Sequence, residues 1–127
     1  DIKDFDISFA RGLSLEDGCA TVTNFTAYLI AKGIEHANGN NNDPIKFLVC
    51  GGGRKNDYLI NSIKSYLSHK QNISLNSIDD YSLNGDYIES QAFGYLAIRS
   101  FLNLPISYPK TTGCIKPTVG GKLAQSF

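Results

Sequence analysis

The sequence predicts an α/β protein in which helices alternate with short strands. Residues 14–36, 57–68 and 87–102 repeat apolar side chains at helical spacing. Residues 45–50 and 73–78 lie between these segments and have the length and bounding residues of strands. Because the order is helix, strand, helix, strand, helix, we expect parallel strands joined by crossover connections.

The first helix is expected from about Ser14 to His36. Ser14 precedes Asp17 in an arrangement that resembles a capping box, which marks a helix start. The apolar positions that follow are Val22, Phe25, Leu29 and Ile30. Glycine and asparagine then cluster at residues 38–42 and Pro44 follows, so we expect a loop before the first strand.

Three consecutive glycines, Gly51, Gly52 and Gly53, separate the first strand from the second helix, which Asn56 is predicted to cap. They match neither a Walker A loop nor a dinucleotide-binding fingerprint. A tight turn would explain glycine by its backbone freedom alone. Since a turn seldom needs three glycines in a row, we favour close approach of a flat or anionic ligand to the backbone at the carboxyl end of the strand.

The second half of the chain is predicted to contain one strand, a polar loop and one long helix. Residues 73–78 alternate apolar and polar side chains, as a half-buried or edge strand does. Residues 79–86 are expected to form the loop, and residues 106–127 an extended, irregular tail. One face of the third helix carries Ile88, Ala92, Tyr95, Leu96, Arg99 and Leu102. Helices this apolar normally cover more than two strands, so we expect further strands or another polypeptide segment alongside.

Few other polar residues are candidates for a catalytic or metal-binding site. Asp79 and Asp80 could act as paired carboxylates, but adjacent side chains diverge and a solvated turn is the favoured interpretation. Glu89 falls in the first turn of the third helix, where the helix dipole stabilises a carboxylate even without a functional role. His36 and His69 each fall near a helix C-terminus and are interpreted as structural. We predict no metal site.

Composition excludes several classes of protein. Lys and Arg together number 12, as do Asp and Glu, so no net charge attracts nucleic acid or an anionic membrane, and no apolar run is long enough to span a bilayer. The three cysteines are far apart and odd in number, which favours reduced thiols in the cytoplasm over a disulfide framework. A length of 127 residues suits a single domain.

The chain begins at Asp1 without a targeting pattern, so we expect a processed protein or a fragment.

Five segments resemble the carboxy-terminal portion of anhydro-N-acetylmuramic acid kinases. They are EDGCATVTNFTA at residues 16–27, VCGGGRKN at 49–56, ESQAFGYLA at 89–97, TGC at 112–114 and GGKL at 120–123. The resemblance covers nearly the whole chain. It implies the sugar kinase, Hsp70 and actin superfamily, whose two lobes each have a ribonuclease H-like core around a nucleotide cleft. The fold implied for residues 1–127 is a single domain, a partial lobe of this kind that lacks the lobe's first strands.

The resemblance also implies an activity and a set of site residues. The family uses ATP and Mg²⁺ to phosphorylate 1,6-anhydro-N-acetylmuramic acid while water opens the anhydro ring, which yields N-acetylmuramic acid 6-phosphate for cell-wall recycling. By resemblance, Gly51, Gly52 and Gly53 form the adenosine-binding loop and Asn56 lies close by. Glu89 matches the family glutamate that faces the sugar and the attacking water.

Two substitutions and two absences limit this resemblance. The family commonly carries glycine where this chain has Ser82, and alanine where it has Ser90; we expect the fold to tolerate both. The Asp-Gly-Thr-Ser-like phosphate loop and the general-base aspartate of the family have no match in these 127 residues. We therefore expect the isolated chain to be inactive and to need an amino-terminal lobe, from the same or a separate chain. The resemblance also allows a homodimer.

Two alternatives remain open at this point. The chain could be a non-catalytic remnant whose helices and tail mediate association, with the glycine loop purely structural. It could also be a stand-alone nucleotide-binding domain of a different lineage, which requires the matches around Glu89 and Thr112 to be coincidental.

Overall fold

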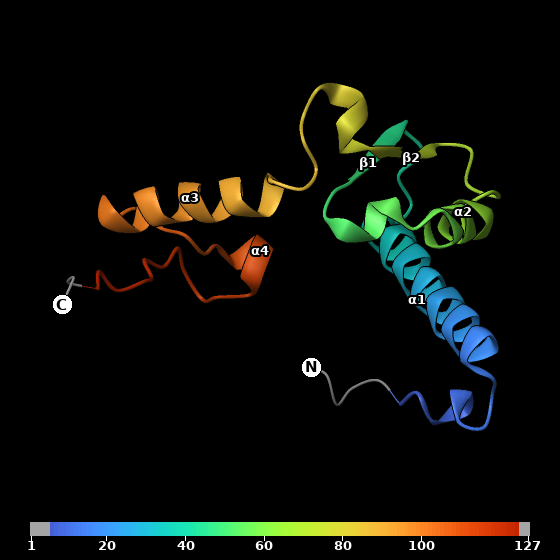
Figure 1. Cartoon of the computed structure of the whole chain (residues 1–127). Coiled ribbons are helices and arrows are strands. Elements are labelled where there is room, and N and C mark those ends of the chain that lie inside the picture. The colour runs from blue at the N-terminus through green and yellow to red at the C-terminus, as the bar shows by residue number, and fades with distance from the viewer. Residues whose placement is uncertain (1–5, 125–127) are drawn as a thin grey trace. The chain divides into compact units, whose positions relative to one another are not determined.

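The computed structural model describes residues 6–124 and confirms the α/β class with parallel strands and three main helices (Figure 1). The helices and strands are α1 (Leu15–Asn38), β1 (Ile45–Val49), α2 (Asp57–Tyr66), β2 (Ile73–Ser77), α3 (Ile88–Phe101) and α4 (Pro109–Thr112). Short 3₁₀ turns span Ser8–Ala10, Gly52–Lys55 and Ile78–Tyr81. This arrangement is consistent with a partial ribonuclease H-like lobe.

The chain forms two compact units, Asp1–Gly85 and Asp86–Phe127, which are described separately. The first contains both strands with α1 and α2, and the second contains α3, α4 and the tail. The assignment of residues 1–127 to a single domain stays a prediction.

The two strands of the first unit pair in parallel, with Ile45 opposite Ile73 and Val49 opposite Ser77. Both strands therefore end at the same edge of the sheet. The glycine loop leaves β1 at this edge, and the turn Ile78–Tyr81 leaves β2 there. Parallel pairing thus brings two segments together that lie far apart in the sequence.

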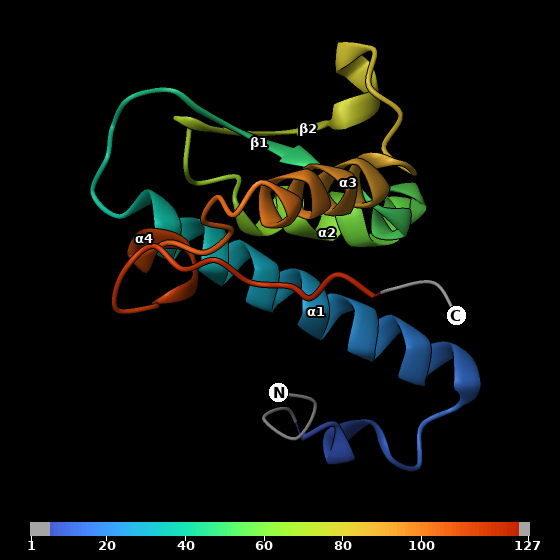
Figure 2. The ribbon, with the colours of Figure 1, turned by 90° about the vertical axis from the view of Figure 1, so that its left-hand side faces the viewer.

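The core of the first unit lies where α1 and α2 pack against each other on one side of the sheet (Figures 1 and 2). The buried side chains are Ala27, Ala31, Ile63 and Leu67. Partly buried apolar side chains from both helices and β2 surround them: Ile34, Leu59, Ile60, Ile73 and Leu75. The small side chains of Ala27 and Ala31 allow α1 to approach α2 closely.

Both predicted helix caps are confirmed. The Ser14 side chain accepts a hydrogen bond from the Asp17 backbone N–H at 3.0 Å, at the start of α1. The Asn56 side chain accepts one from the Leu59 N–H at 3.1 Å, at the start of α2. Each cap satisfies a backbone donor that a helix start would otherwise leave without a partner.

The tail of the second unit is largely irregular among the described residues, as predicted, but it also contains α4 and specific contacts. Ser107 and Thr118 form an antiparallel bridge around α4, and the Ser100 hydroxyl of α3 donates a hydrogen bond to the Gly120 carbonyl. A Cβ atom on Gly120 would lie only 2.9 Å from Cδ1 of Ile106. The tail therefore folds back onto α3 through contacts that helical or strand periodicity does not reveal.

Arg99, which was predicted on the apolar face of the third helix, ties α3 to the segment that follows it. Its Nε donates to the Pro105 carbonyl at 2.7 Å, Nη1 donates to the Tyr95 hydroxyl at 3.0 Å, and Nη2 donates to the Tyr108 hydroxyl at 2.7 Å. Its Cζ also lies 5.6 Å from the centroid of the Tyr95 ring, so the guanidinium contacts both α3 and the following segment.

Large apolar side chains of α3 are exposed. From the sequence we expect further strands or another polypeptide segment alongside the helices, and such a segment could cover these side chains. Phe93, Ile98 and Phe101 expose 64%, 62% and 71% of their surface. The segment that would cover them stays a prediction. Among residues 6–124, no helix has both the length and the hydropathy that crossing a membrane requires.

Candidate functional site

The candidate site is the glycine loop at the carboxyl edge of the two-stranded sheet. Gly51 has a φ of 78°, a left-handed conformation that favours glycine, and its N–H donates to the Gly85 carbonyl at 3.0 Å. The 3₁₀ turn Gly52–Lys55 follows and leads into α2. The prediction of a strand, a glycine turn and a helix start in this order is confirmed.

The three glycines differ in why glycine is needed. Gly51 is required by its backbone conformation, whereas Gly52 and Gly53 have no positive φ. A Cβ atom at Gly52 would meet no atom of the described chain within 4 Å, and one at Gly53 would make an ordinary contact of 3.7 Å with Leu59. Neither backbone nor packing within the described residues therefore calls for glycine at these two positions. The open space beside Gly52 is what a ligand that approaches the backbone closely would need.

Arg54 follows the glycines, and its buried side chain forms an ion pair with the exposed Asp79. Nε of Arg54 lies 2.6 Å from Oδ2 of Asp79, and Nη2 donates to Oδ1 at 3.3 Å. Nη1 donates to the Gly51 carbonyl at 3.0 Å. The Arg54 side chain is 7% exposed and that of Asp79 is 45% exposed. Since two parallel hydrogen bonds fix both planar groups, this pair joins the turn after β2 to the glycine loop after β1.

Asp79 also organises the turn to which it belongs. Its Oδ1 accepts a hydrogen bond from the Gly85 N–H at 2.9 Å, and its Oδ2 accepts one from the Ser77 hydroxyl at 2.9 Å. Asp79 and Asp80 lie in the 3₁₀ turn Ile78–Tyr81 and both are exposed, as the interpretation of a solvated turn expects, but Asp79 is also paired with Arg54. Sequence reasoning missed this pair, because 25 positions separate its two members.

The hydrogen bond from Arg54 holds the pKa of the Asp79 carboxyl well below its ordinary value of 3.8, and the bonds from Gly85 and Ser77 lower this pKa further. A carboxyl whose folded pKa is depressed stabilises the fold above its unfolded pKa, and that contribution is lost as pH falls toward the folded pKa.

Asp79→Asn should therefore lower the urea midpoint of unfolding at neutral pH, because the asparagine amide group faces the Arg54 donors. The difference in urea midpoint between the variant and the unaltered chain should stay constant as pH falls to about 4. It should then shrink below pH 3.8, the ordinary pKa of an aspartate. Urea titrations of both chains over this pH range measure the difference. A difference that shrinks already between neutral pH and pH 5, as a titrating histidine would cause, would contradict the assignment.

Asn56 is the remaining loop residue predicted to bind the nucleotide. Its side-chain oxygen is engaged in capping α2, while its NH₂ group has no hydrogen-bond partner among the described residues. The structure thus brings Gly51, Gly52, Gly53 and Asn56 together in one loop. Their role in binding a nucleotide stays a prediction.

Glu89 lies in the second unit, in the first turn of α3, as predicted, and its carboxylate is exposed. Because it belongs to a different unit from the glycine loop, the structure does not test whether the two share a site. At this position the helix dipole stabilises its carboxylate.

Ser82, where the resemblance implies a glycine, has a φ of 59° in the left-handed region. Serine is strained in this conformation, which explains the family's glycine. Ser82→Gly is expected to raise the free energy of unfolding by about 0.5–1 kcal/mol. Ser62→Gly, inside α2, is the matched control and should lower it by roughly 0.5 kcal/mol. Urea denaturation measures whether the free energy of unfolding rises or falls in each variant. A lower free energy of unfolding in Ser82→Gly would contradict the explanation.

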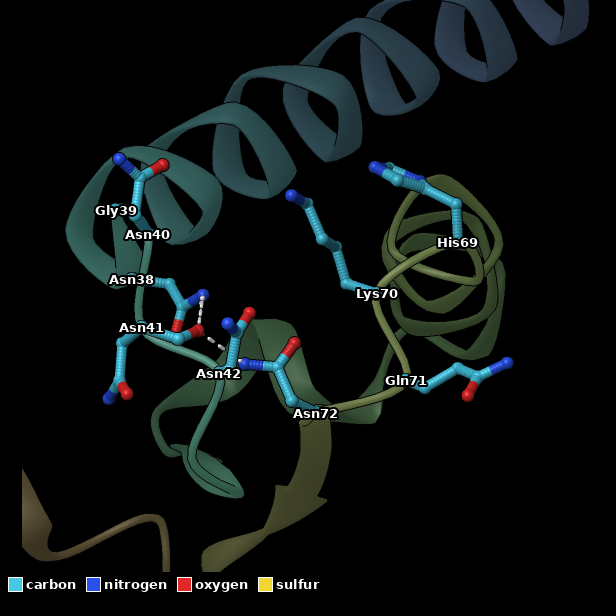
Figure 3. Close-up of a pocket in the computed structure, with 9 residues that line it drawn as sticks. All are labelled: Asn38, Gly39, Asn40, Asn41, Asn42, His69, Lys70, Gln71 and Asn72. Carbon is cyan, nitrogen blue, oxygen red and sulfur yellow. Dashed lines mark hydrogen bonds between the residues drawn. The ribbon is translucent and has the colours of Figure 1, made fainter.

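A second pocket, of about 550 Å³, lies at the opposite edge of the sheet, where both strands begin (Figure 3). Its lining residues are Asn38, Gly39, Asn40, Asn41, Asn42, His69, Lys70, Gln71 and Asn72. The Asn41 carbonyl accepts hydrogen bonds from the side-chain amides of Asn38 at 3.1 Å and Asn72 at 2.8 Å. These bonds tie the loop before β1 to the loop before β2, so we assign the asparagines a structural role.

The fold and the loop together define a class of protein. A glycine loop between a parallel strand and a helix, at the carboxyl edge of the sheet, is typical of α/β proteins that bind nucleotides or phosphates. The family model described as anhydro-N-acetylmuramic acid kinase matches residues 5–126, and the chain belongs to this family.

Named relatives agree with the family. The chain is 51% identical over 128 residues to an anhydro-N-acetylmuramic acid kinase of Pelagibacter ubique, 40% over 123 residues to one of Zymomonas mobilis, and 36% over 121 residues to the second such kinase of a Jannaschia species. These alignments cover 100%, 97% and 95% of this chain but only 34%, 32% and 30% of the relatives. The chain spans about a third of the relatives' length. Membership of this family rules out the different lineage considered above.

Proposed function

We propose that this chain forms the adenosine side of the nucleotide cleft, and part of the sugar site, in a kinase that phosphorylates 1,6-anhydro-N-acetylmuramic acid with ATP and Mg²⁺. The observation that carries the proposal is that neither the backbone nor the described neighbours require glycine at Gly52 or Gly53, and that open space lies beside Gly52. A ribose or adenine that lies against this backbone would explain both. The names of the relatives supply the substrate.

The loop residues suit a nucleotide chemically as well as sterically. Gly51 is fixed in its left-handed conformation, so the two following glycines present a defined backbone surface. The NH₂ group of Asn56 can donate to a ribose hydroxyl or to a ring nitrogen. Val49 and Ile60 supply apolar surface in a small pocket beside Arg54. ATP supplies the phosphoryl group in the proposed reaction, and these residues bind and orient its nucleoside end.

Glu89 is the proposed contribution of the second unit to the reaction. Its exposed carboxylate at the start of α3 can accept hydrogen bonds from a sugar hydroxyl and from the water that opens the anhydro ring. Residues 6–124 contain no group of three His, Cys, Asp or Glu side chains that could hold a metal ion, so we assign no Mg²⁺ ligand to them.

The proposed reaction needs parts beyond those described here. Phosphoryl transfer requires a phosphate clamp, a metal position and a base that orders the nucleophile. The described residues supply a nucleotide-binding loop and one carboxylate. We propose that an amino-terminal lobe supplies the other groups, that the 127 residues alone do not turn over substrate, and that the kinase acts in cytoplasmic recycling of cell-wall sugars, with a homodimer as its proposed assembly.

A chimeric kinase tests the proposal. The chain would replace the matching third of the Pelagibacter ubique kinase, to which it is 51% identical. If the proposal is right, the chimera phosphorylates 1,6-anhydro-N-acetylmuramic acid with ATP, while the 127-residue chain alone does not. A chimera that melts cooperatively, like the parent kinase, but transfers no phosphate would contradict it.

One observation favours a second candidate, an interaction domain without catalysis: the exposed apolar side chains of α3, such as Phe101 at 71%. Light scattering of the isolated chain with and without ATP discriminates between the two. A stable oligomer that ATP leaves unchanged, together with an inactive chimera, would favour the interaction domain.

A further inference from the structure

Arg54 directly follows the three glycines of the loop, a position from which an arginine side chain could bind phosphate. Its geometry indicates another role. The side chain is 7% exposed, its Nε and Nη2 are directed to Asp79, and its Nη1 donates to the carbonyl of Gly51. A guanidinium whose donors are directed to a carboxylate and to the loop itself is placed to fix the loop.

The hydrogen bonds around Asp79 form a closed ring that returns to Gly51. Oδ1 of Asp79 accepts the Gly85 N–H at 2.9 Å, and the Gly85 carbonyl accepts the Gly51 N–H at 3.0 Å. Arg54 binds the Gly51 carbonyl at 3.0 Å, so both polar backbone groups of this glycine are held. These bonds fix the one loop residue whose left-handed conformation sets the direction of the backbone at Gly52.

Gly85 provides the space that the ring requires. It is buried, and its φ is outside the left-handed region, so its backbone does not call for glycine. A Cβ atom there would lie 2.7 Å from Cζ and 2.8 Å from Cδ of Arg54. The guanidinium therefore packs directly on the Gly85 backbone, and any larger residue would push Arg54 away from Asp79 and Gly51.

We propose that Arg54 is a positioning residue: with Asp79 and Gly85 it orders residues 51–53 before a nucleotide arrives. This inference rests on the proposed function of the loop. A loop ordered in advance loses little conformational freedom when ligand binds, whereas a mobile loop must be ordered at the expense of affinity. Arg54 thus acts on ATP affinity through the glycines rather than by contact with the phosphates.

The test uses the full 127-residue chain and amide hydrogen exchange measured by NMR without nucleotide. Asp79→Asn and Gly85→Ala break the ring from two sides, and Arg54→Lys keeps the charge but loses the planar fork. Asp80→Asn removes the same charge one residue away and is the matched control. The Ile63 amide in the core of α2 reports global unfolding in every variant. The dissociation constant for ATP is then measured for each variant in the chimeric kinase, which supplies the amino-terminal lobe.

We expect Gly51 to exchange at least about tenfold faster in Asp79→Asn and Gly85→Ala, with Ile63 unchanged, and ATP affinity to fall about tenfold. The Gly51 exchange rate and the ATP affinity of Arg54→Lys should lie between those of these two variants and those of the control. The control, Asp80→Asn, should match the unaltered chain in both quantities. Unchanged exchange at Gly51 would overturn the inference, as would faster exchange with unchanged ATP affinity. If the unaltered chimera does not bind ATP, the proposed function is contradicted, while the exchange rates still decide whether the ring orders the loop.

Discussion

Replacing Gly52 by leucine is expected to raise the KM for ATP of the chimeric kinase by about 10- to 100-fold, because a side chain would fill the space proposed for the nucleoside. The substitution should not harm the fold. A Cβ atom at Gly52 meets nothing within 4 Å among the described residues, and the backbone there is not left-handed. Steady-state kinetics at varied ATP concentration measure the effect, and thermal melting checks the fold.

Gly33→Leu is the matched control for this prediction. Gly33 lies in α1, and a Cβ atom there also meets nothing within 4 Å. The control should leave the KM for ATP unchanged and should raise helix stability slightly, since leucine is a better helix former than glycine. If Gly52→Leu binds ATP as well as the control does, the space beside the loop is not where the nucleotide lies.

Glu89→Gln is expected to lower kcat of the chimeric kinase by roughly 10²- to 10⁴-fold, with little change in the KM for ATP. Glutamine keeps the size of the side chain but removes the negative charge proposed to orient the sugar and the water. Glu89 also stabilises the start of α3 through the helix dipole, so a loss of activity could in principle come from the helix.

Glu16→Gln separates these two causes. Glu16 is an exposed glutamate in the first turn of α1, so the substitution removes the same charge from an equivalent helix position. The control should cost only about 0.3–1 kcal/mol of stability and leave kcat unchanged. Equal kinetics for the two variants would remove Glu89 from the proposed site.

Features that depend on residues close together in the sequence could be predicted. The caps at Ser14 and Asn56 each join residues three positions apart, and helical or strand periodicity placed the main elements. The glycine loop was identified from its three consecutive glycines, without a neighbouring segment. Local sequence carries this information because caps, turns and amphipathic faces are set over a few residues.

Contacts between distant segments could not be predicted from the same sequence. Arg54 and Asp79 are 25 positions apart, and Gly85 needs to be glycine only because Arg54 packs on it. The return of the tail onto α3 depends in the same way on Ser100 meeting the Gly120 carbonyl. Nothing in the residues next to each partner specifies these pairings, which arise from the parallel register and from tertiary packing.

Hydrogen exchange of the chimeric kinase, measured by mass spectrometry with and without a non-hydrolysable ATP analogue, tests the central claim most directly. The claim is that residues 51–53 and Asn56 form the adenosine-binding wall. It predicts that saturating analogue slows exchange in the peptide covering residues 49–56, while the peptide covering the asparagine-rich loop at residues 38–42 is unchanged. Slower exchange elsewhere in the chimera, with no change in residues 49–56, would contradict it.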